Sequence, residues 1–211
     1  MGGYTFAELS SIFVMQGFAG LSLFSVLLLM ALGLAIIFGQ MGVINMAHGE
    51  FMTIGAYTTV MFSVLTEKFM PGFIGYYFPF AIAVSFLIAF AIGYLAEVAL
   101  IRHLYKRPLD TLLATWGLSL IMQQTFRSAF GAREVSATLP EWLMGSYQPT
   151  EGIDIPLNGL FVMGLTVFVT LGVFWFLFKS RWGLRVRATT QNRLMAGAVG
   201  INTKKVDRVT F

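Results

Sequence analysis

Three polar side chains interrupt an apolar stretch of the sequence near residue 45. The segment NMAHGEF, residues 45–51, contains Asn45, His48 and Glu50. An imidazole, a carboxylate and an amide can all hydrogen-bond a polar solute. In hydrocarbon surroundings such ionisable groups are unfavourable unless paired, and they commonly mark a transport route. The alternative is that they join helices by hydrogen bonds; we favour a role in a route or in its gate.

A second set of polar residues recurs every four positions further along the chain. Thr111, Thr115, Ser119 and Gln123 therefore share one slowly drifting helix face, with Trp116 beside it. Hydroxyl and amide groups carry no charge, which suits a small neutral polar solute, although hydrogen bonding between helices explains them equally well. The predicted pathway residues are Asn45, His48, Glu50, Thr115, Trp116, Ser119 and Gln123.

The residue types exclude several kinds of chemistry. There are no cysteines, which rules out disulfides, thiolate metal ligands and cysteine nucleophiles. His103 is the only other histidine, and the spacing H-E-x-x-H is absent, so no metal site is predicted. The chain has no Walker motif and no visible nucleophile–base pair. We therefore expect neither ATP hydrolysis nor any other enzymatic activity from this chain.

The elements that carry these residues are predicted to be membrane helices. Of the 211 residues, 57% are hydrophobic and only 11% are charged, whereas soluble domains are about one quarter charged. A transmembrane helix needs about 20 mostly apolar residues. Five segments fit this description: 18–38, 43–65, 77–101, 111–130 and 160–178. The sequence therefore predicts an all-α polytopic membrane protein with about five transmembrane helices in a lipid bilayer.

The second of these segments is predicted to be discontinuous. A charge at the middle of a membrane helix costs about 2.5–3.5 kcal/mol, and the apolar residues of 43–65 contribute about −3.5 kcal/mol. Glu50 alone therefore nearly cancels the insertion energy of the segment. His48 and Glu50 also fall on different faces of a continuous helix. An interruption near His48–Gly49 could aim both at one point, as broken helices do at the midplane of many transporters.

Basic residues predict the orientation of the helices. If the five helices alternate, 11 of the 14 Lys and Arg residues fall in 102–110 and 179–208, on one side. Because cytoplasmic loops carry the excess of Lys and Arg, the N-terminus is predicted to be outside and the C-terminus cytoplasmic. The net charge of +4 then reports topology, and no nucleic-acid partner is predicted. The connection 131–159 becomes an extracytoplasmic loop, with a short helix at PEWLMG or a hairpin around EGIDIPLNG.

The segment 184–201 is predicted to bind a protein partner. Its apolar residues recur at helical spacing, opposite the polar face that carries Arg193: Leu194, Met195, Ala198 and Val199. Gly200 stands where this helix would end, and glycine is favoured there because it readily adopts a positive φ. An amphipathic helix can lie on a membrane or in a groove on a partner. We favour the groove, because a simple basic anchor would not need the small-residue run AGAVG.

Three blocks of the sequence resemble permeases of the branched-chain amino acid and urea ABC-importer family. Residues 33–57, GLAIIFGQMGVINMAHGEFMTIGAY, resemble the family's first signature, and residues 185–207, RVRATTQNRLMAGAVGINTKKVD, resemble its cytoplasmic coupling loop. The middle block, LLATWGLSLIMQQTFRSAFGAREV followed by PEWLMG, resembles the urea branch more than the amino-acid branch, as does TTQNR in the coupling loop. The resemblance covers nearly the whole chain and is closest to the urea ABC transporter permease.

The resemblance implies a subunit of a larger importer in the inner membrane of a bacterium. Residues 1–211 would form one transmembrane permease domain, incomplete at its C-terminus because family members continue with further helices. Its partners would be a second permease subunit, cytoplasmic ATPase subunits that use ATP and Mg²⁺, and an extracytoplasmic solute-binding protein; this chain itself would hold no cofactor. Residues 179–208 would be the coupling loop. The residues expected to serve ATPase coupling are Arg187, Ala188, Thr189, Asn192, Arg193, Ala198 and Gly200.

The expected cargo on this resemblance is urea, with branched-chain amino acids as the alternative. An amino acid is zwitterionic and needs charged or helix-end partners, whereas urea needs only amide-like partners. The predominantly neutral face of 111–130 favours urea. The alternative from a different class of protein is a channel or secondary transporter that acts alone. Such a protein would have no use for an ATPase-docking helix in 184–201.

Overall fold

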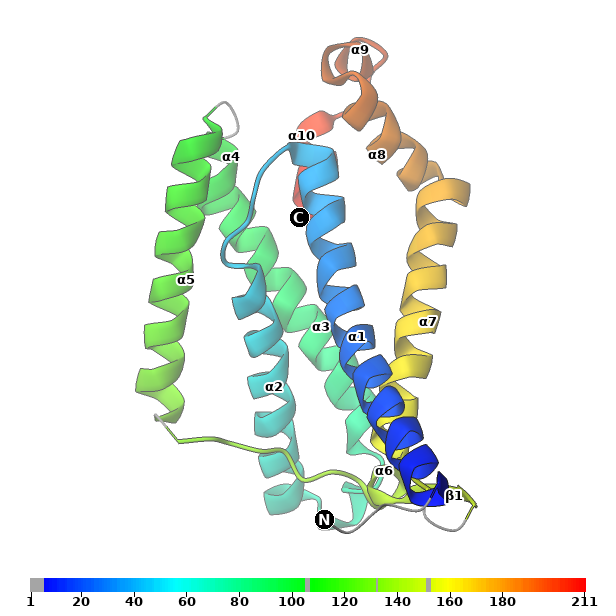
Figure 1. Ribbon diagram of the computed structural model, residues 1–211. Coiled ribbons are helices and arrows are strands. Elements are labelled where there is room, and N and C mark those ends of the chain that lie inside the picture. Colours follow the sequence, from blue (N-terminus) through cyan, green and yellow to red (C-terminus); the bar gives the residue numbers. More distant parts are fainter. Residues whose placement is uncertain (1–5, 105–106, 132, 151–152) are drawn as a thin grey trace. The chain divides into compact units, whose positions relative to one another are not determined.

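Five long helices dominate the structure, a computed structural model that describes residues 6–104, 107–131, 133–150 and 153–211 (Figure 1). They are α1 (Phe6–Met41), α2 (His48–Phe69), α3 (Tyr77–Ala96), α5 (Pro108–Phe130) and α7 (Leu157–Lys179). Three stretches are long and apolar enough to cross a membrane: Glu8–Met41, Tyr77–Leu104 and Leu157–Lys179. Helices α2 and α5 have 22 and 23 residues, long enough to cross, but polar side chains make them less apolar. The predicted all-α membrane fold is confirmed.

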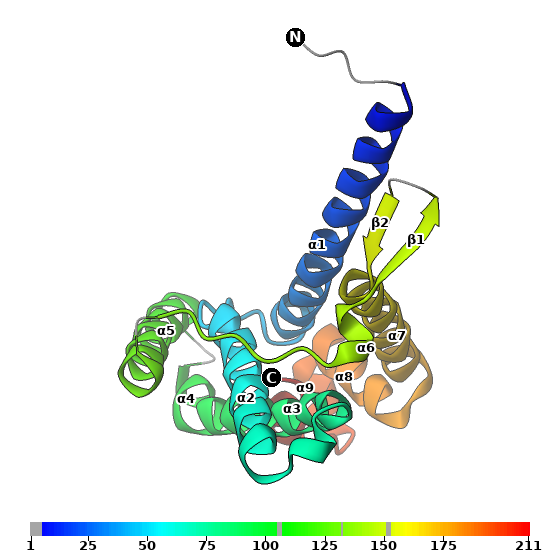
Figure 2. The ribbon, with the colours of Figure 1, turned by 90° about the horizontal axis from the view of Figure 1, so that it is seen from below.

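Shorter elements connect and follow these helices. They are η1 (Pro71–Phe73), the π-helix η2 (Glu97–Ile101), α4 (Arg102–Leu104), α6 (Glu141–Met144), β1 (Ser146–Thr150), β2 (Ile153–Pro156), α8 (Arg181–Gln191), α9 (Arg193–Ala198) and α10 (Thr203–Thr210). The connection 131–159 contains both features offered for it, the short helix α6 and an antiparallel hairpin with Tyr147 opposite Ile155 (Figure 2). Lys106, which was counted for the orientation, and Glu151, the first residue of EGIDIPLNG, lie outside the described residues.

The second segment is not interrupted as predicted: α2 is one continuous helix from His48 to Phe69, and residues 43–47 belong to the connection that follows α1. Gly42 ends α1 with a φ of +64°, a conformation that glycine adopts without strain, and its N–H donates to the Phe38 carbonyl at 2.8 Å. Residues 43–47 are not helical, and α2 begins at His48. Gly49 therefore lies within the first turn of α2, and the expectation that it breaks the helix is wrong. The consequence is a helix N-terminus next to the NMAHGEF polar residues.

The chain forms two compact units, residues 1–32 with 139–173 and residues 33–138 with 174–211. In the first unit, α1 and α7 meet at a glycine. A Cβ on Gly159 would come within 2.7 Å of both Phe18 and Ser22, so no larger residue fits there without movement. About two turns further along α7, the Thr166 hydroxyl donates to the Ser25 carbonyl of α1 at 3.4 Å. Small residues and hydroxyls of this kind allow membrane helices to approach closely.

In the second unit, α2 packs against both α3 and α5. The Ser85 hydroxyl of α3 donates to the Gly55 carbonyl of α2 at 3.2 Å. The Tyr57 ring of α2 stacks on Phe126 and Phe130 of α5, with centroids 5.2 and 4.1 Å apart. Figure 1 shows α2 running beside α3. These contacts fix α2 against α5, the two helices that carry most of the predicted pathway residues.

Candidate functional site

A polar cluster joins the first turn of α2 to the middle of α5. The Glu50 Oε1 atom accepts hydrogen bonds from Gln123 Nε2 at 2.8 Å and from Ser119 Oγ at 3.1 Å. Gln123 Nε2 also lies 3.1 Å from Ser119 Oγ. Because Ser119 and Gln123 are four residues apart, one face of α5 presents both donors together. We call Glu50, Ser119 and Gln123 the polar cluster; the structure brings together three residues that the sequence assigned to one pathway.

The first two residues of the polar α5 face, Thr111 and Thr115, hydrogen-bond to backbone groups of neighbouring segments. The Thr115 hydroxyl accepts a hydrogen bond from the Met46 N–H at 3.2 Å and donates to the Leu112 carbonyl at 3.0 Å. Thr111 is fully buried and donates to the carbonyls of Leu104 and Arg107 at 2.9 and 3.0 Å. The threonines therefore stabilise the non-helical segment before α2 and the turn before α5. Thr115, predicted as a pathway residue, has a structural contact that accounts for its burial.

Asn45 lies directly before α2 and is only 3% exposed. Its Oδ1 atom accepts a hydrogen bond from the Ala47 N–H at 3.0 Å, at the residue that precedes the helix. Its Nδ2 atom is buried and has no hydrogen-bond acceptor among the described residues. Buried polar atoms nearly always have a partner, so this donor is an exception that calls for an explanation.

His48 faces α1 rather than the polar cluster. A Cβ placed on Gly33 would come within 3.1 Å of the imidazole Cε1 and 3.2 Å of Nε2. A side chain at position 33 would therefore crowd the ring and require it to shift by a few tenths of an ångström. The sequence suggested that an interruption could aim His48 and Glu50 at one point. The structure instead places them against different helices, His48 against α1 and Glu50 against α5.

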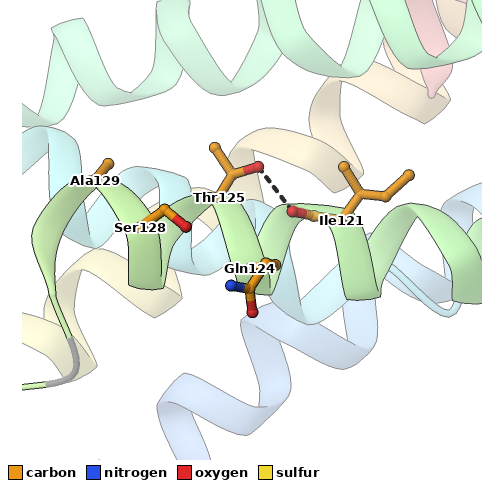
Figure 3. A pocket seen from close by; sticks show the side chains of 5 residues that line it. All are labelled: Ile121, Gln124, Thr125, Ser128 and Ala129. Atoms are coloured by element: carbon orange, nitrogen blue, oxygen red, sulfur yellow. Dashed lines mark hydrogen bonds between the residues drawn. The ribbon is translucent and has the colours of Figure 1, made fainter.

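Trp116 and the outer face of α5 are not part of the polar cluster. The Trp116 side chain is 53% exposed, although it is adjacent to buried Thr115. Further along α5, a hollow of about 530 Å³ is lined by Ile121, Gln124, Thr125, Ser128 and Ala129 (Figure 3). The Thr125 hydroxyl donates to the Ile121 carbonyl of its own helix at 2.7 Å, whereas Gln124 and Ser128 are exposed. Exposed amide and hydroxyl groups are unfavourable on a lipid-facing surface.

Four of the seven predicted coupling residues use their side chains for contacts inside the chain. Arg187 donates from Nη1 to the Leu177 carbonyl at 2.8 Å and lies over the Phe178 ring, so it ties α8 to the end of α7. Thr189 is buried and donates to the Arg185 carbonyl at 2.8 Å. Asn192 caps α9 by accepting the Met195 N–H at 3.0 Å, and Arg193 pairs with Asp207. Ala188 is half-buried, and Ala198 is exposed.

The remaining coupling residue, Gly200, ends α9 as predicted. Its φ is +86°, its N–H donates to the Gly197 carbonyl at 3.1 Å, and the Ile201 N–H donates to the Ala196 carbonyl at 2.9 Å. These two bonds form a Schellman motif, which requires the left-handed conformation at Gly200. Around α9, three apolar side chains form an exposed surface: Leu194, which is 89% exposed, Met195 and Val199.

A second group of charges lies around α10, and the sequence did not identify it. Asp207 is fully buried and pairs with Arg193 of α9. Its neighbour Arg208 lies 3.9 Å from Glu97 of the π-helix η2, measured from Nε to Oε2, and donates from Nη1 to the Tyr94 hydroxyl at 3.4 Å. We call Glu97, Arg193, Asp207 and Arg208 the ion-pair cluster. Asp207 is visible in the sequence as the one acidic residue of the basic tail, but partners 14 and 111 residues apart cannot be assigned without the fold.

Burial perturbs the titration of Asp207, which lies outside the three candidate spans. Its desolvation raises the pKa of the carboxyl above its ordinary value, while Arg193 and the Gln40 side chain act to lower it. The raising effect is the largest of the three. The pairing of Asp207 with Arg193 therefore offsets its burial only in part.

A half-buried polar cluster between α2 and α5, apolar helices long enough to cross a membrane, and a helical tail with an exposed apolar face are features of a membrane transport subunit. The chain belongs to the family described as branched-chain amino acid transport system, permease component, which matches residues 17–211. No solved structure gives a significant match to the chain.

Curated relatives place the chain within the same class. It is 30% identical to the high-affinity branched-chain amino acid transport system permease protein LivH of Salmonella typhimurium, over 94% of this chain and 66% of the relative. It is 28% identical to the corresponding protein BraD of Pseudomonas aeruginosa, over 91% and 64%. A probable LivH of Methanocaldococcus jannaschii is 27% identical, over 86% and 56%. The chain thus spans about two thirds of the length of the LivH protein of Salmonella typhimurium.

Proposed function

We propose that the chain is the membrane-spanning permease subunit of an ATP-driven importer for branched-chain amino acids. The observation that carries the proposal is the polar cluster: a carboxylate between the long helices α2 and α5, bound by neutral donors, in a chain of this permease family. The similar proteins named above are branched-chain amino acid permeases. They do not support the sequence-based preference for urea, and they favour the alternative that the sequence left open.

The proposal includes the partners that a permease requires. The exposed surface of Leu194, Met195 and Val199 supports docking of a cytoplasmic ATPase, because apolar side chains at a helix surface commonly fill a groove on a partner. The exposed Gln124 and Ser128 support contact with a second permease subunit along α5, which would shield these groups from lipid (Figure 3). An extracytoplasmic binding protein would deliver the cargo, and the membrane would be the bacterial cytoplasmic membrane with the α8–α10 region inside.

The cargo is tested by uptake into proteoliposomes that contain the complete system. Vesicles with this chain, its partner permease, the ATPases and the binding protein should accumulate labelled leucine when ATP is enclosed, and vesicles without this chain should not. Labelled urea should remain at the level of empty vesicles. Uptake of urea without uptake of leucine would overturn the amino-acid assignment and restore the urea interpretation.

The docking surface is tested at Gly200. Replacing it with Val puts a β-branched residue at a φ of +86°, which should disrupt the end of α9 and the surface beside it. We expect the variant to reach the membrane but to lose ATP hydrolysis stimulated by the loaded binding protein. Gly197→Ala is the matched control, because a Cβ there meets no atom within 4 Å and the φ is negative. Normal stimulation in Gly200→Val would contradict the docking role.

A further inference from the structure

The carboxylate of Glu50 has no cationic partner among the described residues. Its two hydrogen bonds come from neutral groups, a hydroxyl and an amide, and both go to Oε1. Neutral donors stabilise a carboxylate without cancelling its charge. By contrast, ionisable groups between membrane helices are normally paired with a charge of opposite sign. Glu50 is half-buried, and among the described residues no cation of this chain compensates a charge on its carboxylate.

Hydrogen-bond donors lie at the same end of α2. The Nδ2 atom of Asn45 is buried and has no acceptor, while its Oδ1 atom is held against the Ala47 N–H, so the amide group is fixed beside the start of the helix. In the first turn, the N–H groups of His48 and Glu50 donate to the carbonyls of Asn45 and Ala47. The Gly49 N–H makes no backbone hydrogen bond among the described residues, and a Cβ on Gly49 would meet no atom within 4 Å, so the helix surface is open at this position.

Resting on the permease function proposed above, we infer that the N-terminal end of α2 is a binding site for the charged backbone of an α-amino acid. Glu50 binds the ammonium group, and Asn45 Nδ2 with the Gly49 N–H binds the carboxylate. A helix N-terminus attracts anions because its first N–H groups have no acceptor within the helix and its dipole is positive there. Interrupted membrane helices bind substrate carboxylates in this way in secondary transporters.

The arrangement fits a zwitterion better than a neutral amide. One turn of helix rises about 5.4 Å, so donors at the start of α2 and a carboxylate in its first turn lie within the reach of one small molecule. A neutral solute such as urea would leave the charge of Glu50 without compensation. An ammonium group paired with it, together with a carboxylate at the helix end, compensates both charges at once.

The inference predicts that the two charges of the ligand depend on different residues. Labelled leucine is bound to the assembled importer without nucleotide or binding protein, by a scintillation proximity assay, and is displaced by two analogues. Leucinamide carries the ammonium group without a carboxylate, and 4-methyl-2-oxopentanoate carries the carboxylate without an ammonium group. Glu50→Gln should weaken competition by leucinamide by about tenfold or more, the size of one charged hydrogen bond, and leave the keto acid unaffected.

Asn45→Asp should show the reverse pattern. It keeps the Oδ1 acceptor for the Ala47 N–H and replaces the free donor with an oxygen, so competition by the keto acid should fall while that by leucinamide does not. Thr58→Val is the matched control, because the Thr58 hydroxyl donates only to the Ile54 carbonyl of its own helix. Equal weakening of both analogues by both variants, or no change in either, would overturn the inference, as would a wild-type complex that binds no leucine.

The outcome separates this inference from the proposed function. If the complete wild-type system accumulates leucine in vesicles but the two variants compete like wild type, the permease function stands and the zwitterion site is wrong. If the complete system accumulates urea and not leucine, the permease cargo itself is wrong and the site falls with it.

Discussion

The polar cluster and the ion-pair cluster hold carboxylates in opposite ways. Glu50 accepts from Ser119 and Gln123, which are neutral. Asp207 pairs with the guanidinium of Arg193, and Glu97 lies near that of Arg208. Both clusters lie in the second compact unit, so one set of helices supports both. The difference is that the charges of one cluster are balanced within the chain and the charge of the other is not.

This difference separates a structural role from a binding role. The ion-pair cluster links α9 and α10 to the π-helix that follows α3. Phe211, directly after α10, contacts α2, where its ring centroid is 6.1 Å from that of Phe51. Removing one member of such a pair leaves a buried charge uncompensated. The polar cluster needs no other charge for its own stability, because its hydrogen bonds survive if the carboxylate becomes an amide. The comparison therefore predicts stability effects in one cluster and activity effects in the other.

The largest expected effect on stability is that of Arg193→Gln. It leaves Asp207, which is 0% exposed, without its cation. We expect a loss of about 1–3 kcal/mol in the free energy of unfolding, less than for a fully buried pair because Arg193 is 41% exposed. Chemical denaturation in detergent measures it. Lys204→Gln, an exposed tail residue, is the control, and equal stability of the two variants would remove the structural role of the pair.

Glu50→Gln should give the opposite pattern. The Gln carbonyl can still accept from Ser119 and Gln123, so the free energy of unfolding should change by no more than about 0.5 kcal/mol. Uptake of leucine should fall about tenfold or more, which is about 1.4 kcal/mol on the limiting step. The same substitution in the ion-pair cluster, Glu97→Gln, should instead lower the free energy of unfolding. If Glu50→Gln unfolded as readily as Arg193→Gln with no separate loss of uptake, the polar cluster would be helix-joining structure.

The five helices could be predicted because their signal is local. Apolar runs of about 20 residues and the glycine after Val199 depend on neighbouring residues only, and both appear in the structure. The residue at which α2 starts could not be predicted from such local signals. It depends on the positive φ of Gly42 and on the hydrogen bond from the Met46 N–H to Thr115, a contact between residues 69 positions apart.

The site could be predicted in its residues but not in its pairings. Ser119 and Gln123 were assigned to one face because that follows from helical spacing, and Glu50 was assigned to the route because of its charge. That they meet depends on the packing of α2 against α5, which the sequence does not specify. Arg193 was assigned to ATPase coupling because of its place in the tail, whereas its partner is Asp207 of the same chain. The role of Gly33 had no signal, because close approach to His48 is visible only in three dimensions.

Gly33→Ala should affect transport more than stability. The added methyl group lies 3.1 Å from the His48 ring and forces it to move by a few tenths of an ångström. Crowding costs about 1 kcal/mol, but alanine favours the helix by a similar amount, so the two effects offset each other. We expect unchanged stability and a severalfold fall in leucine uptake. Gly39→Ala, where a Cβ meets no atom within 4 Å, should gain the helix contribution and keep full uptake; equal uptake in both variants would show that the position of His48 does not matter.

The smallest expected effect concerns pH and the ion-pair cluster alone. Because the pKa of Asp207 is raised in the folded chain, the folded state holds this proton at a pH at which the unfolded chain has released it. The contribution of Asp207 to stability is therefore complete below its ordinary pKa of 3.8 and is lost as the pH rises through the folded value. Asp207→Asn cannot titrate, so relative to this variant the wild type should lose stability from acidic to neutral pH. Thermal unfolding in detergent between about pH 4 and 7 measures the difference, and Glu50→Gln, which leaves the ion-pair cluster intact, should retain the wild-type slope. Parallel curves for wild type and Asp207→Asn would mean that the pairing with Arg193 fully offsets the burial of Asp207, and the ion-pair cluster would then be as well balanced as its geometry allows.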